Sequence, residues 1–322
     1  MARRDDYRRV AAILKGANRI ALCVHMFPDG DALGSMTALA LACRRMGKSV
    51  ALFSPSELPR RYHFLPLYGA IRTQPPHDTV YDVAVALDCA SQAQLGSFYH
   101  AVFQRAAKTV VIDHHLFRRH FTDTALVSER AAAVGEIIYD LAAHLGVRVD
   151  RRMAVAILVS LIVETGSFRL PSVTQKTFRI CADLLGRGVD YNELVEQSYW
   201  CRTAAEAHLL GLCFARIRLY GRGRLAVSYI TEADMKRYGG RNEDVDPIAD
   251  QIRTLKNVRV VLLLRDMDKH RWRVSLRSKG RINVGRVAEN FGGGGHTDVA
   301  GCYLKKSEKD KRRLIHELKA LL

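Results

Sequence analysis

Acidic and histidine side chains are concentrated in four short clusters in the first half of the chain. They lie at residues 25–31, at Asp88, at residues 113–115 and at Glu164. Three of them directly follow a short apolar run, where a polar side chain is costly unless something binds it. A divalent metal ion is the simplest partner for a group of carboxylates and imidazoles. The clusters therefore predict a metal centre.

The first cluster offers one imidazole and two carboxylates, from His25, Asp29 and Asp31. Pro28 and Gly30 favour a tight turn between them. Asp29 and Asp31 are two residues apart, so in an extended loop their side chains would point to different sides. We therefore expect each of them to serve a different one of two adjacent metal ions.

The other clusters would complete these two ion sites. Asp88 is a single carboxylate at a strand end, suited to bridge both ions, while His114 and Glu164 would complete the second site. Carboxylates and imidazoles without thiolates suit manganese or magnesium better than structural zinc. Two such ions, roughly 3.5–4 Å apart, hold a bridging water, lower its pKa and stabilise a phosphoryl transition state.

Each of these residues also has an ordinary structural explanation when it is taken alone. Asp29 could cap the helix that follows it, and Asp88 could be a loop carboxylate. His114 or His115 could be a hydrogen-bonded histidine without a ligand. These separate structural roles do not explain why all of the residues would lie together at one edge of a sheet.

The elements expected to position the clusters alternate between strands and helices. Strands are predicted at residues 19–24, 48–53, 81–87 and 109–112, and helices at 32–46, 132–145, 152–163 and 174–185. This alternation is typical of an α/β fold with a parallel, doubly wound sheet, in which ligands bind beyond the carboxyl ends of the strands. Three clusters follow predicted strands, so they should lie at one edge of that sheet.

The pattern changes after residue 188. Helices are expected at 191–200 and 204–218, followed by longer, alternating strands at 225–230, 258–265 and 271–276 and by a terminal helix at 308–321. A chain of 322 residues is also too long for one typical core. We therefore expect a domain with the metal centre at 1–188, a linker region with a helix at 189–203, and a smaller α/β domain that binds substrate at 204–322.

A glycine run at residues 292–295 is the main motif of the second domain. Bare backbone amides beside His296 can bind an anion, although such a run can also be a simple flexible loop. Arg277 and Ser278, at the preceding strand end, add a guanidinium and a hydroxyl suited to phosphate. We expect these two residues, Gly294, Gly295 and His296 to bind substrate.

The composition favours a polyanionic partner. The chain has 50 Lys and Arg against 33 Asp and Glu, a formal net charge of +17. This points to a nucleotide or a nucleic acid, or simply to a basic surface.

The 7 cysteines lack Cys-x-x-Cys spacing and are expected to be reduced. With no membrane span and no secretory leader expected, the predicted location is the cytoplasm.

Together these residues resemble the DHH family of phosphoesterases, and the resemblance extends over nearly the whole chain. The motifs that carry it are Asp113-His114-His115, residues 25–35, Asp88 and, for the DHH-associated C-terminal domain, residues 277–278, 287–288 and 292–301. Within the family, the chain is most similar to the bacterial nanoRNases, which combine oligoribonuclease activity with hydrolysis of 3'-phosphoadenosine-5'-phosphate (pAp).

The resemblance implies a role for each candidate residue. The implied ligands are His25, Asp29 and Asp88 for one manganese ion, and Asp31, Asp88, His114 and Glu164 for the other. His115 would face the scissile phosphate or the leaving group, and Asp113 would orient a histidine. Arg277, Ser278, Gly295 and His296 would bind another phosphate or nucleotide of the substrate.

One residue departs from the family pattern. Glu164 stands where the family usually has Asp, and its side chain is one methylene longer. Glu164 would either bind the second ion directly or act through a water molecule. Direct ligation is the alternative we favour.

The expected function is manganese-dependent hydrolysis of short RNA or DNA oligonucleotides to mononucleotides, together with conversion of pAp to AMP. Magnesium is the alternative metal, and the sequence leaves a homodimer open. Three other functions compete with this expectation. They are a phosphodiesterase of cyclic or linear dinucleotides, a single-strand exonuclease and, outside the enzymes, a nucleotide-sensing binding module.

Overall fold

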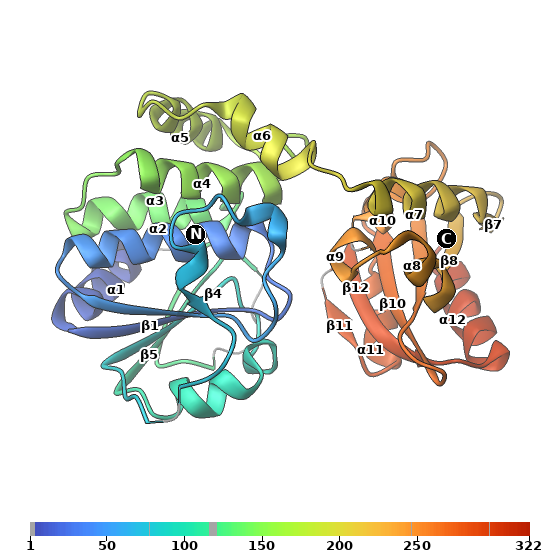
Figure 1. Ribbon diagram of the computed structural model, residues 1–322, viewed down its shortest axis with the longest axis horizontal. Helices are drawn as coiled ribbons and strands as arrows, with labels where there is room; N and C mark the ends of the chain where they lie inside the picture. The colour runs from blue at the N-terminus through green and yellow to red at the C-terminus, as the bar shows by residue number, and fades with distance from the viewer. Residues whose placement is uncertain (1–3, 77, 116–120, 246, 296) are drawn as a thin grey trace. The chain divides into compact units, whose positions relative to one another are not determined.

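The chain folds into two compact units, Met1–Cys201 and Arg202–Leu322 (Figure 1). The computed structural model describes residues 4–76, 78–115, 121–245, 247–295 and 297–322. Each unit contains a six-stranded sheet. Every helix within these ranges is too short or too polar to span a bilayer.

The first unit is built on a parallel sheet. Its strands are β1 (Arg19–Val24), β2 (Ser49–Phe53), β3 (Ile71–Arg72), β4 (Val83–Leu87), β5 (Lys108–Asp113) and β6 (Thr124–Val127), in the order β3-β2-β1-β4-β5-β6. The central strands are apolar on both sides because both faces of the sheet are covered. The predicted parallel α/β sheet is confirmed, and the carboxyl ends of β1, β4 and β5 are neighbours at one edge.

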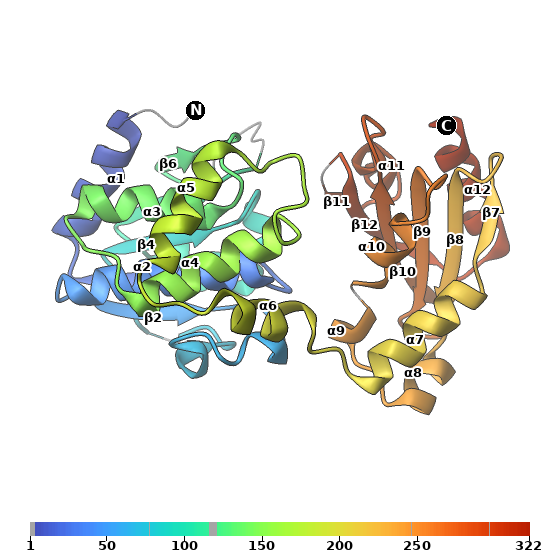
Figure 2. The same ribbon diagram turned by 90° about the horizontal axis from the view of Figure 1, so that it is seen from above.

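Helices cover one face of this sheet in a closely packed layer (Figures 1 and 2). α1 (Arg4–Gly16), α2 (Gly30–Arg45) and α3 (Val134–Leu145) lie on the sheet, and α4 (Arg151–Glu164) packs on α2 and α3. α5 (Gln175–Leu185) and α6 (Tyr191–Tyr199) lie beyond α4. The segment at residues 92–103 covers the opposite face through Leu95, Phe98 and Phe103.

The helices α2 and α4 approach each other so closely that a side chain at Gly34 has no room. A Cβ atom there would lie 2.4 Å from the backbone oxygen of Ala156. Nearly every residue of α2 is buried, including Asp31 in its first turn. This contact brings the start of α2, the start of α3 and the middle of α4 together beside the carboxyl ends of the strands.

The second unit has a mixed sheet in the order β11-β12-β10-β9-β8-β7. Its strands are β7 (Arg218–Tyr220), β8 (Leu225–Ile230), β9 (Val260–Asp266), β10 (Arg271–Ser278), β11 (Gly294–Gly295) and β12 (Val299–Lys305). Only β8 and β9 pair in parallel among these described strands.

Helices cover both faces of this second sheet, but not to the same extent. They are α7 (Ala204–Ala215), α8 (Glu232–Tyr238), α9 (Asn242–Val245), α10 (Ile248–Arg253), α11 (Val284–Asn290) and α12 (Glu308–Ala320). α7 and α10 share a core with one face, and α11 and α12 share a core with the other (Figure 2).

The structure also contains elements that the sequence pattern did not predict, namely α1, α8, α9, α10, β3, β6, β7, β11 and β12. The helix expected at 132–145 begins two residues late, at Val134. Ala133 has no side chain that could cap this helix, and the free N–H groups of its first turn bind Asp31 instead. All seven cysteines are free, and six of them are buried.

Candidate metal centre

The first group of candidate ligands joins the ends of β1 and β4 to the start of α2. His25 follows β1, and its Nε2 atom lies 3.5 Å from Oδ2 of Asp88, which follows β4. Asp29 caps α2, because its Oδ1 atom accepts hydrogen bonds from the N–H groups of Asp31 at 2.9 Å and Ala32 at 3.1 Å. One ligand atom each of His25, Asp29 and Asp88 lies within 4.8 Å of the others. The cap and the metal-ligand explanations of Asp29 are therefore compatible.

The second group lies directly beside the first. Nε2 of His114 is 3.7 Å from Oδ2 of Asp31, 3.6 Å from Oε1 of Glu164 and 3.8 Å from Oδ1 of Asp88. Glu164 is the last residue of α4, so its side chain reaches the strand edge from the helical layer. His114 follows β5. Residues far apart in the sequence thus converge on one imidazole.

Asp88 lies between these two groups. Its Oδ2 atom faces His25, while its Oδ1 atom is 3.3 Å from Nδ1 of His115 and 3.8 Å from Nε2 of His114. Its backbone has φ = +57°, a left-handed conformation that Asp and Asn adopt more readily than most other residues. Strained backbone of this kind is concentrated at functional sites.

Asp113 fixes the two histidines that follow it. Its Oδ1 atom accepts hydrogen bonds from the backbone N–H of His114 at 2.6 Å and of His115 at 2.9 Å, and lies 2.6 Å from Nδ1 of His115. Burial disfavours a charged His115, but the carboxylates of Asp113 and Asp88 outweigh it and raise the pKa to about 9. In the same way, Asp88 outweighs burial at His25 and raises its pKa to about 9.

The sequence analysis missed the groups that hold Asp31 in place. The hydroxyl of Ser160, in α4, donates a hydrogen bond of 2.6 Å to Oδ1 of Asp31. The N–H of Val134, at the start of α3, donates to Oδ2 at 2.9 Å. Burial and the charge of Asp88 raise the pKa of Asp31 well above its usual range, and these donors oppose the shift. A lone serine within the apolar run of residues 156–163 was the available signal for a buried polar partner.

The donor atoms fit a divalent cation. Oδ1 of Asp88, Oδ2 of Asp113 and Nε2 of His114 are buried, and none of them has a hydrogen-bond partner among the described residues. Buried polar atoms are rarely left in this state, since each costs about 1–3 kcal/mol. A cation would bind Oδ1 of Asp88 and Nε2 of His114 at the same time, and a set without thiolates suits a hard metal.

The candidate substrate residues of the second unit have structural partners of their own. Nε of Arg277 lies 3.0 Å from Oδ2 of Asp250. Ser278 is buried, and its hydroxyl donates to the carbonyl oxygen of Ile282 at 2.6 Å. That proton is therefore engaged within the fold. His296 lies outside the described residues.

Close strand pairing explains part of the glycine run. A Cβ atom at Gly293 would lie 2.1 Å from the backbone oxygen of Gly301, and one at Gly295 would lie 2.5 Å from Cα of Ala300. Gly294 pairs with Gly301 in β12, yet nothing would contact a Cβ atom on it. Gly294 and Gly295 are both exposed, so their backbone borders the surface.

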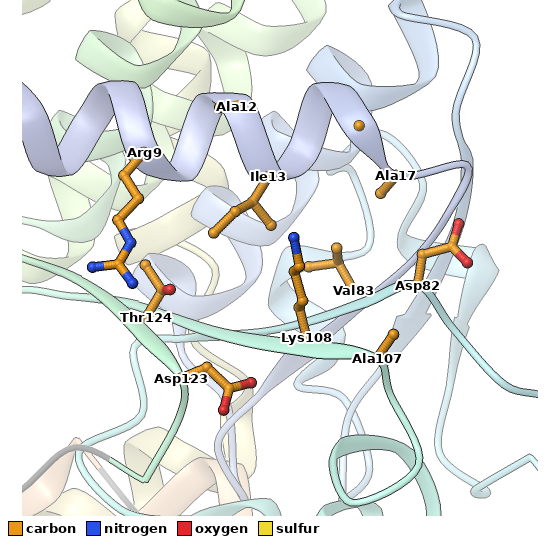
Figure 3. A pocket seen from close by; sticks show the side chains of 11 residues that line it. Arg9, Ala12, Ile13, Ala17, Asp82, Val83, Ala107, Lys108, Asp123 and Thr124 are labelled. Atoms are coloured by element: carbon orange, nitrogen blue, oxygen red, sulfur yellow. The ribbon is translucent and has the colours of Figure 1, made fainter.

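A separate cavity of about 660 Å³ lies at the opposite, amino ends of β4, β5 and β6 (Figure 3). Arg9 and Ile13 of α1 line it together with Lys108. Its two carboxylates already accept backbone hydrogen bonds: Asp82 from the N–H groups of residues 18 and 19, and Asp123 from that of residue 109. The cavity is therefore distinct from the candidate metal centre.

Known proteins resemble this chain over almost its full length. One is the bifunctional oligoribonuclease and PAP phosphatase NrnA of Thermus thermophilus, 30% identical over 312 residues that cover 95% of this chain and 91% of that protein. The crystal structure of an exopolyphosphatase-related protein from Bacteroides fragilis superimposes with a TM-score of 0.90 at 20% identity, covering 99% of this chain and 96% of the other.

A more distant likeness is to RecJ of Thermus thermophilus in complex with Mn²⁺. Its TM-score is 0.58 at 17% identity, over 98% of this chain and 54% of RecJ.

Family models match each of the two units. The N-terminal domain of the DHH family matches residues 19–161, which include Asp113 and every candidate ligand except Glu164. The DHHA1 domain matches residues 222–322. With the relative that is 30% identical over nearly the whole chain, these matches show that this protein belongs to the DHH family.

Proposed function

We propose that this protein is a manganese-dependent phosphoesterase that hydrolyses short oligonucleotides to mononucleotides and converts pAp to AMP. The observation that carries the proposal is the pair of adjacent ligand groups around Asp88. His25, Asp29 and Asp88 would bind one ion, and Asp31, His114 and Glu164 would bind the other with Asp88 between them. Bound divalent ions supply a Lewis acid for phosphoryl oxygens and an activated water as nucleophile.

The chain itself contributes orientation and charge to this chemistry. Asp113 fixes the ring of His115 through Nδ1 and fixes the following backbone through two N–H groups. A His115 ring held in this way would face a phosphate or a leaving oxygen in a fixed orientation, as a group that transfers a proton needs. Ser160 and the start of α3 hold Asp31 in a single position, as residues behind metal ligands generally do.

The second unit would bind the part of the substrate that does not react. Arg277 and the exposed backbone of Gly294 and Gly295 are the described candidates, together with His296. Guanidinium groups and backbone N–H groups both suit phosphate oxygens. The domain division we propose keeps a catalytic domain at 1–188, a connecting region at 189–203 and a substrate domain at 204–322.

The relatives support this choice among DHH functions. The curated protein from Thermus thermophilus carries both activities in its name, and the chains align over nearly their whole lengths. RecJ structures of Thermus thermophilus were obtained with Mn²⁺ and with Mg²⁺, so both ions are tested.

A substrate panel tests the proposal directly. Purified protein is incubated with pAp, a dinucleotide, a cyclic dinucleotide or a twenty-nucleotide strand, each with Mn²⁺, with Mg²⁺ or with EDTA. We expect AMP from pAp and mononucleotides from the dinucleotide with Mn²⁺, and no product with EDTA. Preferred cleavage of the cyclic dinucleotide would replace the proposed substrate class. Absence of product from every substrate with either metal would contradict the proposal.

A further inference from the structure

One part of the second sheet is left without a helical cover. α11 and α12 pack on one face of β10 and β12, through Val274, Leu276 and Cys302 among others. On the opposite face, α7 and α10 form a core with β8 and β9. Six described residues of β10 and β12 on that side, away from α10, are at least partly exposed: Arg271, Arg273, Ser275, Gly301, Tyr303 and Lys305. We call these six residues the β10–β12 face.

Strand register places its cations and its aromatic ring in adjacent rows. Arg273 is directly opposite Tyr303, and Arg271 is directly opposite Lys305. Opposed residues of an antiparallel pair point to the same side of the sheet, so all four share one surface. The Tyr303 side chain is 52% exposed, and Cζ of Arg271 lies 5.9 Å from its ring centroid. The face therefore carries three cations around one exposed aromatic ring, with Asp268 paired to Arg271 at its border.

The next row of the sheet has almost no side chains. Ser275 is opposite Gly301, and Gly301 is in turn opposite Gly294. This strip separates the Arg273–Tyr303 row from Arg277, four residues further along β10. At about 3.3 Å per residue, the two arginines are about 13 Å apart along the strand. Between them only the side chain of Ser275 stands on this row, so backbone is accessible there.

We propose that the β10–β12 face binds single-stranded nucleic acid, specifically the nucleotides of a substrate that lie beyond those bound near Arg277. A tyrosine ring stacks on any base, and arginine and lysine side chains bind the backbone phosphates whatever the sequence. Tyr303 would stack on a base, while Arg273 and Lys305 would contact phosphates. The inference rests on the proposed phosphoesterase function and extends it, because strands longer than a dinucleotide gain contacts that pAp lacks.

Direct binding tests this inference apart from catalysis. Fluorescence anisotropy of a labelled hexanucleotide and a labelled dinucleotide is measured on the full-length protein in EDTA. Tyr303→Thr keeps a residue that favours strands but removes the ring, and should weaken hexanucleotide binding by at least about fivefold. The dinucleotide affinity should change by less than twofold. Tyr303→Phe retains the ring and should bind the hexanucleotide as the wild type does.

Matched controls separate the face from a general effect of charge or aromaticity. Tyr229 is 43% exposed on β8, outside the β10–β12 face, so Tyr229→Thr should leave both affinities unchanged. Arg273→Gln should lower the slope of log K against log salt concentration by about 0.7 for the hexanucleotide, since one phosphate contact is lost. Arg218→Gln, at an exposed position of β7, should leave that slope unchanged.

A folded Tyr303→Thr variant that binds the hexanucleotide within twofold of wild type would overturn the inference. An equal loss of affinity for the dinucleotide and the hexanucleotide in Tyr303→Thr would also overturn it. Steady-state kinetics with Mn²⁺ keep this failure distinct from failure of the proposed function. If wild type hydrolyses the dinucleotide but Tyr303→Thr leaves the hexanucleotide KM unchanged, only the inference fails. If wild type binds the hexanucleotide through Tyr303 yet hydrolyses neither substrate, only the proposed function fails.

Discussion

At the scale of single residues, Asp88 combines a constrained backbone with one carboxylate oxygen that lacks a hydrogen-bond partner. It has a positive φ and is nearly fully buried, and its Oδ1 atom points toward two histidines without a hydrogen bond to a described residue. Such a residue costs folding free energy in two ways. A position between two proposed metal ions explains why that cost is tolerated.

We predict that Asp88→Asn abolishes hydrolysis while the fold is retained. The amide keeps the shape of the side chain and the tolerance for positive φ, but it removes the negative charge proposed to bridge the ions. Turnover should fall by more than about a thousandfold, while Asp88→Ala should cost an additional 1–2 kcal/mol, approximately, of folding free energy. Turnover and thermal melts of the three proteins are compared. Appreciable turnover by Asp88→Asn with Mn²⁺ would exclude the bridging role.

We predict that Glu164→Gln lowers manganese affinity and that Glu164→Asp is tolerated. The Gln variant loses a charged oxygen 3.6 Å from His114, whereas Asp keeps the charge and restores the usual residue of the family. Manganese titrations of wild type and both variants decide the matter. Wild-type metal affinity and turnover in the Gln variant would mean that Glu164 does not bind the ion directly.

We predict that Ser160→Ala lowers the free energy of unfolding by about 1–3 kcal/mol, because a buried carboxylate loses a donor. Its hydroxyl also accepts a hydrogen bond from the N–H of Gly135 at 2.9 Å, so two buried groups are affected. Ser160→Thr retains the hydroxyl but adds a methyl group, so it tests whether the hydrogen bond to Asp31 or the size of the side chain determines stability. Chemical denaturation measures the change, and an unaltered midpoint in Ser160→Ala would remove Ser160 from the support of Asp31.

At the scale of elements, the site depends on how closely α2 and α4 pack. The contact at Gly34 sets the distance between α2 and α4. The same two helices carry Asp31, Ser160 and Glu164. A small increase in their separation would move ligands on both helices away from those on the strands. Packing of two helices therefore controls the geometry of the site.

We predict that Gly34→Ala destabilises the first unit by more than about 2 kcal/mol, since the new methyl group meets backbone rather than a movable side chain. Gly16→Ala is the control in the same unit. Gly16 lies at the end of α1 with open space around it, so alanine should be neutral or stabilising there. Equal melting temperatures for the two variants would contradict the proposed packing constraint.

The convergence of the candidate site residues at one sheet edge could be predicted from the sequence because strand ends are local features. Asp88 and Asp113 each come at the end of an apolar run, and parallel strands align those ends. The hydrogen bond from Ser160 to Asp31 could not be predicted from the sequence, because it depends on the distance between two helices. The burial of Ser278 was accessible in principle: Val274, Leu276 and Ser278 alternate onto the covered face of β10. One glycine, Gly301, and the small residues beside it weakened the strand pattern of β12.

At the scale of the whole molecule, the two units have separate cores. The buried clusters of the first unit and those of the second have no residue in common. All of the proposed metal ligands belong to the first unit, and the β10–β12 face belongs to the second. Metal binding and nucleotide binding should therefore act on different cooperative units.

We predict that calorimetry resolves two unfolding transitions and that Mn²⁺ raises the midpoint temperature of only one, that of the first unit. A ligand at one hundred times its dissociation constant stabilises by about 2.7 kcal/mol, which corresponds to a rise of about 5–10 °C for a unit of this size. Asp88→Asn should abolish the shift. A single transition, or equal shifts in two, would contradict independent units.

The order of the ligands along the chain also has a consequence for biosynthesis. The proposed ligands lie between His25 and Glu164, and the second unit begins only at Arg202. Domains generally fold in order as the nascent chain leaves the ribosome. The proposed metal ligands can therefore come together while the β10–β12 face, proposed to bind nucleotides, is still being translated. A chain terminated early within the second unit would then keep all of the proposed metal ligands but lack the β10–β12 face.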